Sequence, residues 1–406
     1  MKKINLGVIF DEKLFSGGGY QQEINAALLA ARLPKDSVNV VFFTLFKESE
    51  VVLSEHGISS TLIKLSIFSR LRNFLRSGVK SPKIFKIFKI IERYTTFERV
   101  LIDHDIDLVY FLSPSYLANY LDELNFITTV WDLCHRDNPE FPEVRLNRET
   151  EKRELNLRKI LVRATAILVD SELGHKNIVH RYGVDWERIH IMPFQGSVAI
   201  RNSVDSENIP KINVKEKYSM EFPYIFYPAQ FWAHKNHFYL LKGLHLLEKK
   251  YGLIVGAIFS GGDQGNLNHI RKCAIKLNLN ERVKFLGFVG NDDIPELYRQ
   301  SLALVMPSYF GPTNLPPLEA FCLGVPVLYS KMKGFCEQVG DAGLLMDLTN
   351  PDSMAQHIYK LIQEPNLRKK LIINGHERLK HINSIDRNEV LKKIINDFRW
   401  RRMCWP

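Results

Sequence analysis

The stretch MPSYFGPTNLPPLEAFCLGVPV, residues 306–327, decides the fold. It predicts a buried strand that ends near Met306, then a loop of Gly, Pro and Asn, then a helix that opens near Pro316. Proline is tolerated in the first helical turn because its missing N–H has no partner there in any case. The apolar run that begins at Val325 predicts the next strand. This order of strand, loop, helix and strand is typical of a parallel α/β sheet.

The start of this helix has the features of an anion site. The amides of Thr313, Asn314 and Leu315 stand at the N-terminus of the expected helix, where backbone N–H groups attract negative charge. Glu319 follows about one turn later, and its carboxylate can accept hydrogen bonds from two neighbouring hydroxyls, as on a ribose. A simpler interpretation is that Glu319 only answers the helix dipole. With Leu315 as the cap, however, Glu319 lies beyond the usual capping-box position.

Short apolar runs alternate with helical patterns along the rest of the chain. Runs that are apolar on both faces are typical of buried parallel strands. In the first half the expected strands are Ile4–Phe10, Val38–Phe43, Leu108–Phe111, Ile127–Trp131 and Ile167–Val169. In the second half they are Tyr224–Tyr227, Leu253–Phe259, Val283–Phe285, Ala303–Met306 and Val325–Leu328.

The alternation predicts an α/β protein of two doubly wound, Rossmann-like domains. A polar stretch, residues 200–223, separates the two rhythms, so we expect one domain over 1–200 and a second over 201–384. The final helix and basic tail, 385–406, are expected to pack back on the first domain. Because ligands bind at the carboxyl ends of strands in such sheets, we expect a site between the halves.

Composition excludes several classes of protein. The chain has 406 residues, of which 45% are hydrophobic and 25% charged, as in a soluble globular protein with two cores. No stretch reaches the length of about 18 apolar residues that a membrane-spanning helix needs. The five cysteines have no paired spacing, which suits a reducing cytoplasm and indicates neither a disulfide framework nor a zinc site.

A second motif, YPAQFWAHKNH at residues 227–237, follows the first strand of the expected second domain. We predict that Lys235 binds phosphate, with help from Gln230 and with His234 and His237 nearby; the alternative is a solvated surface lysine. Two weaker motifs follow later strands. Gly262 lies in a Gly-Gly-Asp turn that is also an ordinary turn sequence. Phe288 is a candidate to flank a base, and a core phenylalanine is the alternative.

The expected first domain contributes two further motifs. Gly18 and Gly19 follow a strand and open a helix, so the backbone there can approach a ligand closely. A flexible turn is the alternative. Asp132 and His135 come after a later strand, three positions apart, and are candidate groups for substrate binding or catalysis. Pairs of this kind are often structural, so that alternative stays open.

With these motifs the chain resembles glycosyltransferase family 4, whose members have the GT-B fold. The resemblance implies that Glu319 is the second glutamate of the family's Glu-x7-Glu motif and binds the nucleotide ribose. The first glutamate of that motif falls at Gly311, a departure that affects contacts to the donor sugar. Lys235 matches the family's phosphate-binding lysine, whereas Gln230 replaces an arginine and Trp131 a histidine. The resemblance implies that the backbone amides between the two glutamate positions of the motif hold the donor diphosphate, and that Asn314 or Thr313 makes the sugar contacts of the missing glutamate.

The resemblance implies a retaining transferase that moves a hexose-type sugar from a nucleoside-diphosphate sugar to a saccharide or lipid-linked acceptor, in surface polysaccharide or glycolipid synthesis. Lys235, Asp132 and His135 are the residues assigned to catalysis. No metal or other cofactor is expected, because a lysine and backbone amides can stabilise the charge on the leaving diphosphate. A sugar-nucleotide hydrolase or epimerase on the same frame is the alternative.

The net charge of +10 raises the question of a polyanionic partner. Residues 69–99 hold nine Lys and Arg but only two acids, interleaved with bulky apolar side chains. This pattern predicts an amphipathic helix on an anionic membrane, which would place a cytoplasmic protein at the inner face of that membrane. A core-facing helix with a charged outer side is the alternative. Nucleic-acid binding is the least favoured reading, because the chain carries no recognised nucleic-acid motif.

Overall fold

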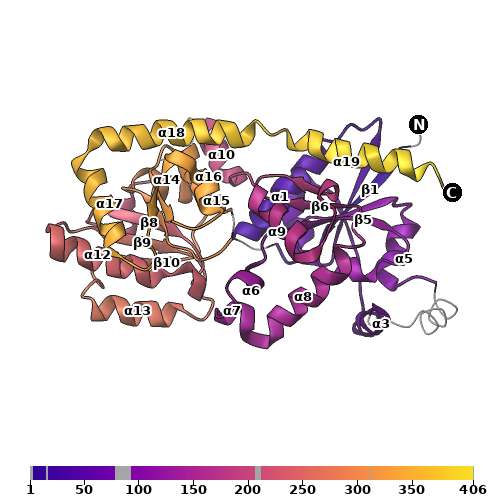
Figure 1. Cartoon of the computed structure of the whole chain (residues 1–406), viewed down its shortest axis with the longest axis horizontal. Helices are drawn as coiled ribbons and strands as arrows, with labels where there is room; N and C mark the ends of the chain where they lie inside the picture. The colour runs from indigo at the N-terminus through magenta and orange to yellow at the C-terminus, as the bar shows by residue number, and fades with distance from the viewer. Residues whose placement is uncertain (1–2, 15–16, 78–92, 206–211, 312, 406) are drawn as a thin grey trace. The chain divides into compact units, whose positions relative to one another are not determined.

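The computed structural model describes residues 3–14, 17–77, 93–205, 212–311 and 313–405. The chain divides into two compact units, each built around one parallel sheet (Figure 1). The first unit comprises Met1–Leu133, Glu151–Pro193 and Asp386–Pro406. The second comprises Cys134–Thr150 and Phe194–Ile385. Within the described part of the chain, no helix has the length and apolar character needed to cross a membrane.

The first unit contains a seven-stranded sheet in the order β3-β2-β1-β4-β5-β6-β7. Its strands are β1 (Ile4–Phe10), β2 (Val38–Thr44), β3 (Ser60–Leu62), β4 (Leu108–Phe111), β5 (Asn125–Val130), β6 (Ala166–Val169) and β7 (Ile189–Ile191). Every pairing between them is parallel. The central strands are apolar on both faces because helices cover both; all four residues of β4 are buried. The strand order reverses between β1 and β4.

The helices of the first unit connect successive strands. They are α1 (Gly18–Ala31), α2 (Lys47–Glu55), α3 (Ile67–Ser77), α5 (Thr96–Asp103), α8 (Glu149–Ile160) and α9 (Glu172–Tyr182), with 3-10 turns η1 (Leu117–Tyr120) and η3 (Trp186–Arg188). The last helix, α19 (Arg387–Arg402), packs against α1. Arg387 also donates to the carbonyl of Pro193 at 2.7 Å. The prediction that the C-terminal helix returns to the first domain is therefore confirmed.

The second unit contains a six-stranded parallel sheet in the order β10-β9-β8-β11-β12-β13. Its strands are β8 (Tyr224–Pro228), β9 (Gly256–Ser260), β10 (Val283–Gly287), β11 (Leu304–Met306), β12 (Val327–Ser330) and β13 (Gly343–Met346). The chain leaves β8 toward one edge and returns at β11 to build the other half. The strand order therefore reverses between β8 and β11, and the carboxyl ends of these two strands flank the switch point.

Helices lie on both faces of this second sheet, with α12 and α13 on one side and α14 and α15 on the other (Figure 1). The long helices are α10 (Val198–Asp205), α12 (His237–Tyr251), α13 (Leu267–Lys276), α15 (Leu315–Cys322), α17 (Asp352–Gln363) and α18 (Pro365–Asn383). The short ones are α6 (Cys134–Asp137), α7 (Pro142–Arg145), η2 (Leu146–Arg148), α11 (Val214–Tyr218), η4 (Ala233–Lys235), α14 (Ile294–Arg299), α16 (Phe335–Val339) and η5 (Gly340–Ala342). The prediction of two doubly wound α/β domains is confirmed.

The divisions between the units differ in detail from those expected at 200/201 and 384/385. Residues 134–150 lie within the expected first domain but belong to the second unit. Residues 194–200 do so as well. The physical reason is side-chain contact: Glu143 of the earlier segment bonds to His234, and the amide of Ser197 bonds to Glu319. Neither contact is visible in the local sequence, because each joins residues about a hundred positions apart.

Candidate functional site

The two strongest sequence motifs lie at the switch point of the second sheet. The motif at 227–237 leaves the carboxyl end of β8, and the motif at 306–319 leaves the carboxyl end of β11. These are the two strands between which the strand order reverses. In open α/β sheets a ligand binds in the crevice at this point, because loops from the two halves diverge there. The fold therefore brings the two motifs to adjacent strand ends, although 79 positions separate residues 227 and 306.

Lys235 ends the short turn η4, and hydrogen bonds hold both its backbone carbonyl and its backbone amide. The hydroxyl of Tyr227, on buried β8, donates to the carbonyl of Lys235 at 3.1 Å. The amide of Lys235 donates to the carbonyl of Trp232 at 3.2 Å. Asn236 then takes a left-handed conformation, with φ of 55°, that turns the chain into α12. Lys235 is half-buried, so its loop is fixed while its charge stays near the surface.

His237 and His234 have different surroundings. His237 is fully buried, and its ring stacks on Phe231 with centroids 4.3 Å apart. Burial, with Lys235 nearby, lowers the pKa of His237 to about 3, so this ring is a neutral part of the core. A contribution of His237 to a phosphate site is therefore a wrong expectation. His234, by contrast, stacks on Phe310 with centroids 3.8 Å apart, and its carbonyl accepts from the amide of Tyr309 at 2.9 Å.

Glu143 fixes the lysine loop from a distant part of the chain. Its Oε1 accepts the backbone N–H of His234 at 2.9 Å and also contacts Nδ1 of the same residue. Burial acts to raise the pKa of Glu143, but the hydrogen bonds from the His234 side chain and backbone lower it overall. Phe141 packs beside this contact against Tyr309 and Phe310. The segment 134–150 thus braces the loops after both β8 and β11.

Glu319 lies in the second turn of α15 and is buried, with 7% of its surface exposed. Its Oε1 accepts the amide of Ser197 at 3.3 Å, and its Oε2 accepts the hydroxyl of Tyr298 at 2.9 Å. Burial raises the pKa of Glu319, although the bonds from Ser197 and Tyr298 oppose this. A carboxylate oxygen can accept two hydrogen bonds, so this fixed group has the acceptor capacity for a pair of ligand hydroxyls.

The residues around Glu319 were not found by sequence reasoning. Gly196 lies against it, and a side chain at that position would begin 3.6 Å from the Glu319 Cγ. Tyr298 is on α14 and Ser197 precedes α10, so three separate segments meet at one carboxylate. No local pattern marks these partners, because a lone Tyr in a helix or a Ser in a polar stretch has many ordinary uses.

The start of α15 differs from the expected row of open amides. The amide of Asn314 donates to Oε1 of Gln338 at 3.0 Å, and the carbonyl of Asn314 accepts from the same side chain. The Asn314 side chain donates to the carbonyl of Gly311 at 3.0 Å and to the hydroxyl of Tyr329 at 2.6 Å. The prediction that Asn314 offers a free amide is therefore wrong. Thr313 and Leu315, the latter buried, flank it.

The departure at Gly311 has a backbone cause. Gly311 has a φ of +96°, which L-residues with a side chain rarely adopt, and an added Cβ would lie 3.3 Å from Oδ1 of Asn314. A glutamate at this position would therefore be strained in this loop. The protein instead uses Asn314 to close the turn by bonding to the Gly311 carbonyl.

The other predicted donor-site residues of the second unit lie on loops after β8, β9 and β10. The Gln230 side chain accepts a bond from the indole N–H of Trp232 at 3.0 Å. Gly262 follows β9, its carbonyl accepts from the amide of Phe231 at 2.9 Å, and an added Cβ there would meet nothing within 4 Å. Phe288, directly after β10, is 71% exposed, so the alternative of a core phenylalanine is wrong.

The predicted residues Gly18, Gly19 and Asp132 belong to the first unit. Gly18 and Gly19 begin α1 at the carboxyl end of β1. A Cβ on Gly19 would lie 3.3 Å from the ring of Trp131, so Gly19 lets the helix pack against that indole. Asp132, two residues after β5, pairs with Arg153 at 3.1 Å. His135 lies in α6 of the second unit, where it is 2% exposed.

The structure also shows a pair of acids that sequence reasoning missed. Asp11 follows β1, and its carboxylate accepts hydrogen bonds from Ser113 at 3.1 Å and from Ser115, both just after β4. Burial raises the pKa of Asp11 to about 6. Glu23, on α1, is 2% exposed, and burial followed by the charge of Asp11 raises its pKa well above the ordinary value. This pair lies at the switch point of the first sheet.

Among the described residues, no group of three or more His, Cys, Asp or Glu side chains is arranged to hold a metal ion. The run of residues 103–107, Asp-His-Asp-Ile-Asp, has the spacing of an Asp-x-Asp metal motif, but it lies where a helix ends and the next strand begins. Asp103 ends α5, and Asp107 accepts the amide of Asn5 at 3.0 Å, so this aspartate pins β1 beside β4.

Comparisons with known proteins place this chain among glycosyltransferases. Residues 208–378 match the family model described as glycosyl transferases group 1. O-antigen chain mannosyltransferase B of Escherichia coli is 26% identical over 318 residues, which cover 77% of this chain and 79% of that protein. O-antigen chain mannosyltransferase RfbU of Salmonella typhimurium is 25% identical over 210 residues, which cover 52% of this chain and 54% of that protein.

Solved structures show the same architecture. HepE of Anabaena, crystallised with UDP-glucose, matches with a TM-score of 0.69 and 16% identity, over 98% of this chain and 99% of that chain. The GT-B fold implied by the resemblance is therefore confirmed. The fold, the family match over the second unit and the mannosyltransferase relatives together define the chain as a glycosyltransferase.

Proposed function

We propose that this glycosyltransferase belongs to family 4 and moves a hexose-type sugar, with retention, from a nucleoside-diphosphate sugar to a saccharide or lipid-linked acceptor. The reaction would serve cytoplasmic assembly of a surface polysaccharide or glycolipid. The relatives named as O-antigen mannosyltransferases support this class of product. The neighbour crystallised with UDP-glucose supports a sugar nucleotide as the donor.

One observation carries the proposal: Lys235 lies on the loop that follows β8, and Glu319 lies in the helix that follows the loop after β11, and these two strands flank the switch point of the second sheet. An ammonium group suits a diphosphate, and a buried carboxylate suits a vicinal diol such as ribose. In this assignment Glu319 accepts the ribose hydroxyls while Tyr298 and Ser197 hold the carboxylate still. Lys235 approaches the phosphates from the braced loop.

The chemistry follows from where charge develops. As the glycosidic bond to the diphosphate breaks, negative charge grows on the leaving phosphate oxygens. A positive group that is already in place stabilises that charge without reorganisation, which is worth about 10²–10³ in rate for a single donor in known enzymes. Lys235 has this role in the proposal. Gly18 and Gly19 let the backbone of their own loop approach the ligand closely. The transfer is proposed to need no metal ion.

The first experiment is a thermal-shift panel of nucleoside diphosphates and glucose and mannose sugar nucleotides, with wild type and Glu319→Ala. A ligand that binds only the folded state raises the melting temperature, and the shift grows with the logarithm of the ratio of ligand concentration to Kd. We expect at least one nucleotide to stabilise the wild type and to stabilise Glu319→Ala much less. If no nucleotide shifts the wild type, or if both proteins shift equally, the assignment of this pocket is wrong.

The second experiment follows the fate of the donor with a radiolabelled sugar and membrane or oligosaccharide acceptors. Label that moves into the acceptor supports a transferase, whereas release of free sugar at the same rate without acceptor supports the hydrolase alternative. Activity that survives chelation by EDTA supports metal independence. Activity that disappears with EDTA and returns only with added metal contradicts it.

A further inference from the structure

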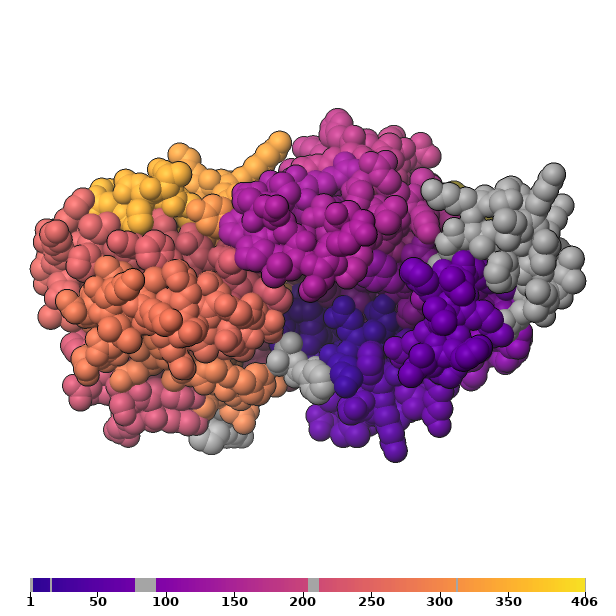
Figure 2. Space-filling model, turned by 90° about the horizontal axis from the view of Figure 1, so that it is seen from below, coloured from indigo at the N-terminus to yellow at the C-terminus, as the bar shows by residue number. Residues whose placement is uncertain are grey.

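Helix α3 of the first unit carries several large apolar side chains that are exposed at the surface. Five large apolar residues on this helix are exposed: Ile67 by 87%, Phe68 by 84%, Leu71 by 55%, Phe74 by 66% and Leu75 by 55%. A single exposed apolar residue is ordinary on a protein surface, but a contiguous group marks an interaction site. In Figure 2 the violet surface of this part of the first unit faces the viewer.

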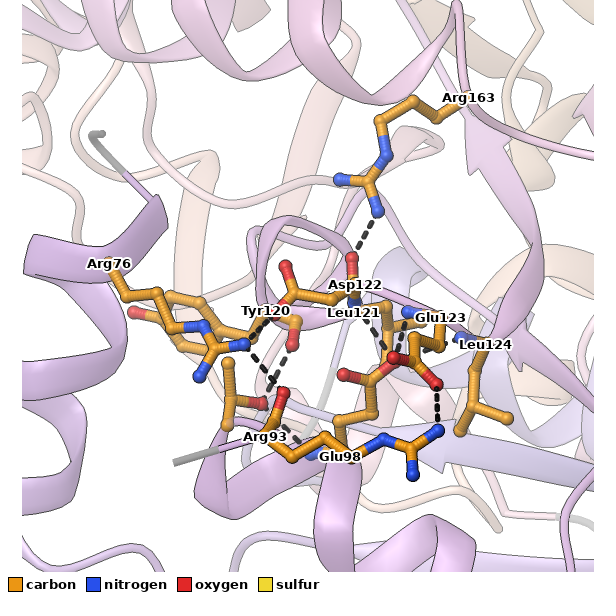
Figure 3. Close-up of polar contacts among 10 residues, drawn as sticks. Arg76, Arg93, Glu98, Tyr120, Leu121, Asp122, Glu123, Leu124 and Arg163 are labelled. Atoms are coloured by element: carbon orange, nitrogen blue, oxygen red, sulfur yellow. Dashed lines mark hydrogen bonds and ion pairs between the residues drawn. The ribbon is translucent and has the colours of Figure 1, made fainter. Parts of the chain in front are cut away.

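The polar residues of α3 face the protein instead. Ser69, Asn73 and Arg76 are 8%, 1% and 4% exposed. Arg76 donates to the carboxylate of Asp122 at 2.5 Å and to the carbonyl of Arg93 at 2.8 Å, as Figure 3 shows. Burying this face and exposing the apolar one reverses the usual arrangement of a surface helix.

The contact that holds the polar face is built into a fixed loop. Glu98 of α5 is fully buried, and its Oε1 accepts the amides of Asp122, Glu123 and Leu124 at 2.9, 2.6 and 2.9 Å (Figure 3). Asp122 is thus held by its backbone while its side chain pairs with Arg76. The orientation of α3 is therefore imposed by a buried ion pair on an ordered loop, because removing Arg76 from Asp122 would leave a buried charge without its partner.

Arginines border the exposed apolar face on both sides. In a helix with about 100° between successive residues, the five apolar side chains span about 120°, and Arg70 and Arg72 lie about 40° beyond its two edges. Both arginines are exposed, and Arg72 reaches Thr96 at 3.0 Å. In sequence, the chain continues with Lys80, Lys83, Lys86 and Lys89. Apolar side chains flanked by long cationic ones suit the boundary between lipid headgroups and acyl chains.

We propose that α3 docks the protein on an anionic lipid bilayer by inserting its apolar face among the acyl chains, with Arg70 and Arg72 at the headgroups. The charge of the flanking residues selects a negatively charged surface over a neutral one. This docking site lies outside the transfer machinery of the second unit. It places the membrane contact that the sequence predicts over 69–99 on α3; residues 78–92 lie outside the described part of the chain.

Vesicle flotation tests the proposal, with vesicles of phosphatidylcholine alone and vesicles that also contain phosphatidylglycerol. We expect the full chain to float with the second kind only, and to release when salt is raised. The double variant F68S/L71S should partition about 100-fold less strongly, because two large apolar side chains no longer enter the lipid. Arg70→Gln should bind more weakly and with a smaller salt dependence.

Two controls separate docking from misfolding and from the transferase function. Trp186→Ser removes another exposed aromatic of the same unit, 65% exposed on η3, and should float like the wild type. The melting temperature of F68S/L71S, and its shift by nucleotides, should match the wild type, because neither side chain is packed in the core. No flotation of the wild type with anionic vesicles overturns the proposal. So does unchanged flotation of the double variant, or a lower melting temperature, which would show that protein covers this face.

Discussion

The two sheets reverse their strand order in the same way but hold different chemistry at that point. At the switch point of the second sheet, Lys235 supplies a cation on a braced loop and Glu319 a carboxylate held by two hydrogen bonds. At the switch point of the first sheet, the structure has two buried acids, Asp11 and Glu23, whose pKa values are raised. The comparison teaches that topology places a site, while loop residues decide what it binds.

The difference has a physical consequence for each half. A lysine favours a ligand of high negative charge, so the second switch point suits a diphosphate. Two neighbouring acids repel such a ligand when ionised, but they suit a neutral ligand with hydroxyl groups. The family match also falls on the second half, at residues 208–378. We therefore expect substitutions in the second unit to have the largest effects on donor binding. Substitutions at the two acids of the first unit should instead change the stability of the protein and its dependence on pH.

The largest effect is expected from Lys235→Ala. Loss of the ammonium group removes the stabilisation of charge on the leaving diphosphate, so kcat/KM should fall about 100-fold or more. The measurement is the initial rate of sugar transfer at several donor concentrations. Lys235→Arg should keep part of the activity because the charge remains. A kcat/KM of Lys235→Ala within threefold of the wild-type value would show that Lys235 does not stabilise the charge on the leaving diphosphate.

Asp11→Asn is expected to stabilise the protein at neutral pH. The folded-state pKa of Asp11 is raised from 3.8 to about 6, so the folded state binds this proton more tightly than the unfolded state. Wild-type stability therefore decreases as pH rises between these values and stays lower above them. Asparagine cannot ionise, so the variant should gain about 1–3 kcal/mol in unfolding free energy above that range.

The gain from Asp11→Asn should disappear in acid, below the ordinary pKa, where the wild-type carboxyl is protonated in both states. Urea unfolding across this pH range measures it. The exposed Asp103 offers a matched control, since Asp103→Asn changes a charge at the surface of the same unit. If the gain in unfolding free energy were equal at all pH values, the effect of Asp11 on stability would not come from its ionisation.

Glu319 should give nucleotide binding a pH dependence of its own. Burial raises the pKa of Glu319, so its carboxylate becomes protonated on acidification earlier than an ordinary glutamate. A protonated carboxyl accepts fewer hydrogen bonds from ribose hydroxyls, so the affinity for the nucleotide should fall by about tenfold as Glu319 becomes protonated. Calorimetry with the best nucleotide measures it. Glu319→Gln should bind weakly at all pH values and lose this pH dependence.

The smallest effect is expected from Glu143→Gln. The amide oxygen of glutamine can still accept the backbone N–H of His234, but this acceptor carries no negative charge. The unfolding free energy should therefore fall by about 0.5–1.5 kcal/mol. The donor KM should rise modestly, because the lysine loop is less firmly held. Thermal unfolding and donor titration measure the two effects. Glu221→Gln, at an exposed position of the same unit, should change neither.

Most of the framework was predictable from the sequence. Short runs that are apolar on both faces located the strands, because buried parallel strands need no polar side. Glycine, proline and asparagine after Met306 and Tyr227 located the loops at the strand ends. Lys235 and Glu319 were identified from their own motifs, a lysine in the loop after a strand and a carboxylate about one turn into a helix, and from the resemblance to family 4. Local chemistry and periodicity were sufficient for this part.

The tertiary structure decided the contacts that no local pattern carries. Tyr298 and Ser197 reach Glu319, and Glu143 braces His234 from another segment, because folding joins residues from separate elements, 21 positions apart for Tyr298, 122 for Ser197 and 91 for Glu143. The same holds for α3. Its sequence grouped the apolar residues on one face, since helical spacing is a local property. Only the buried pair of Arg76 with Asp122 decided that this face turns outward, because a helix orients by what its neighbours offer.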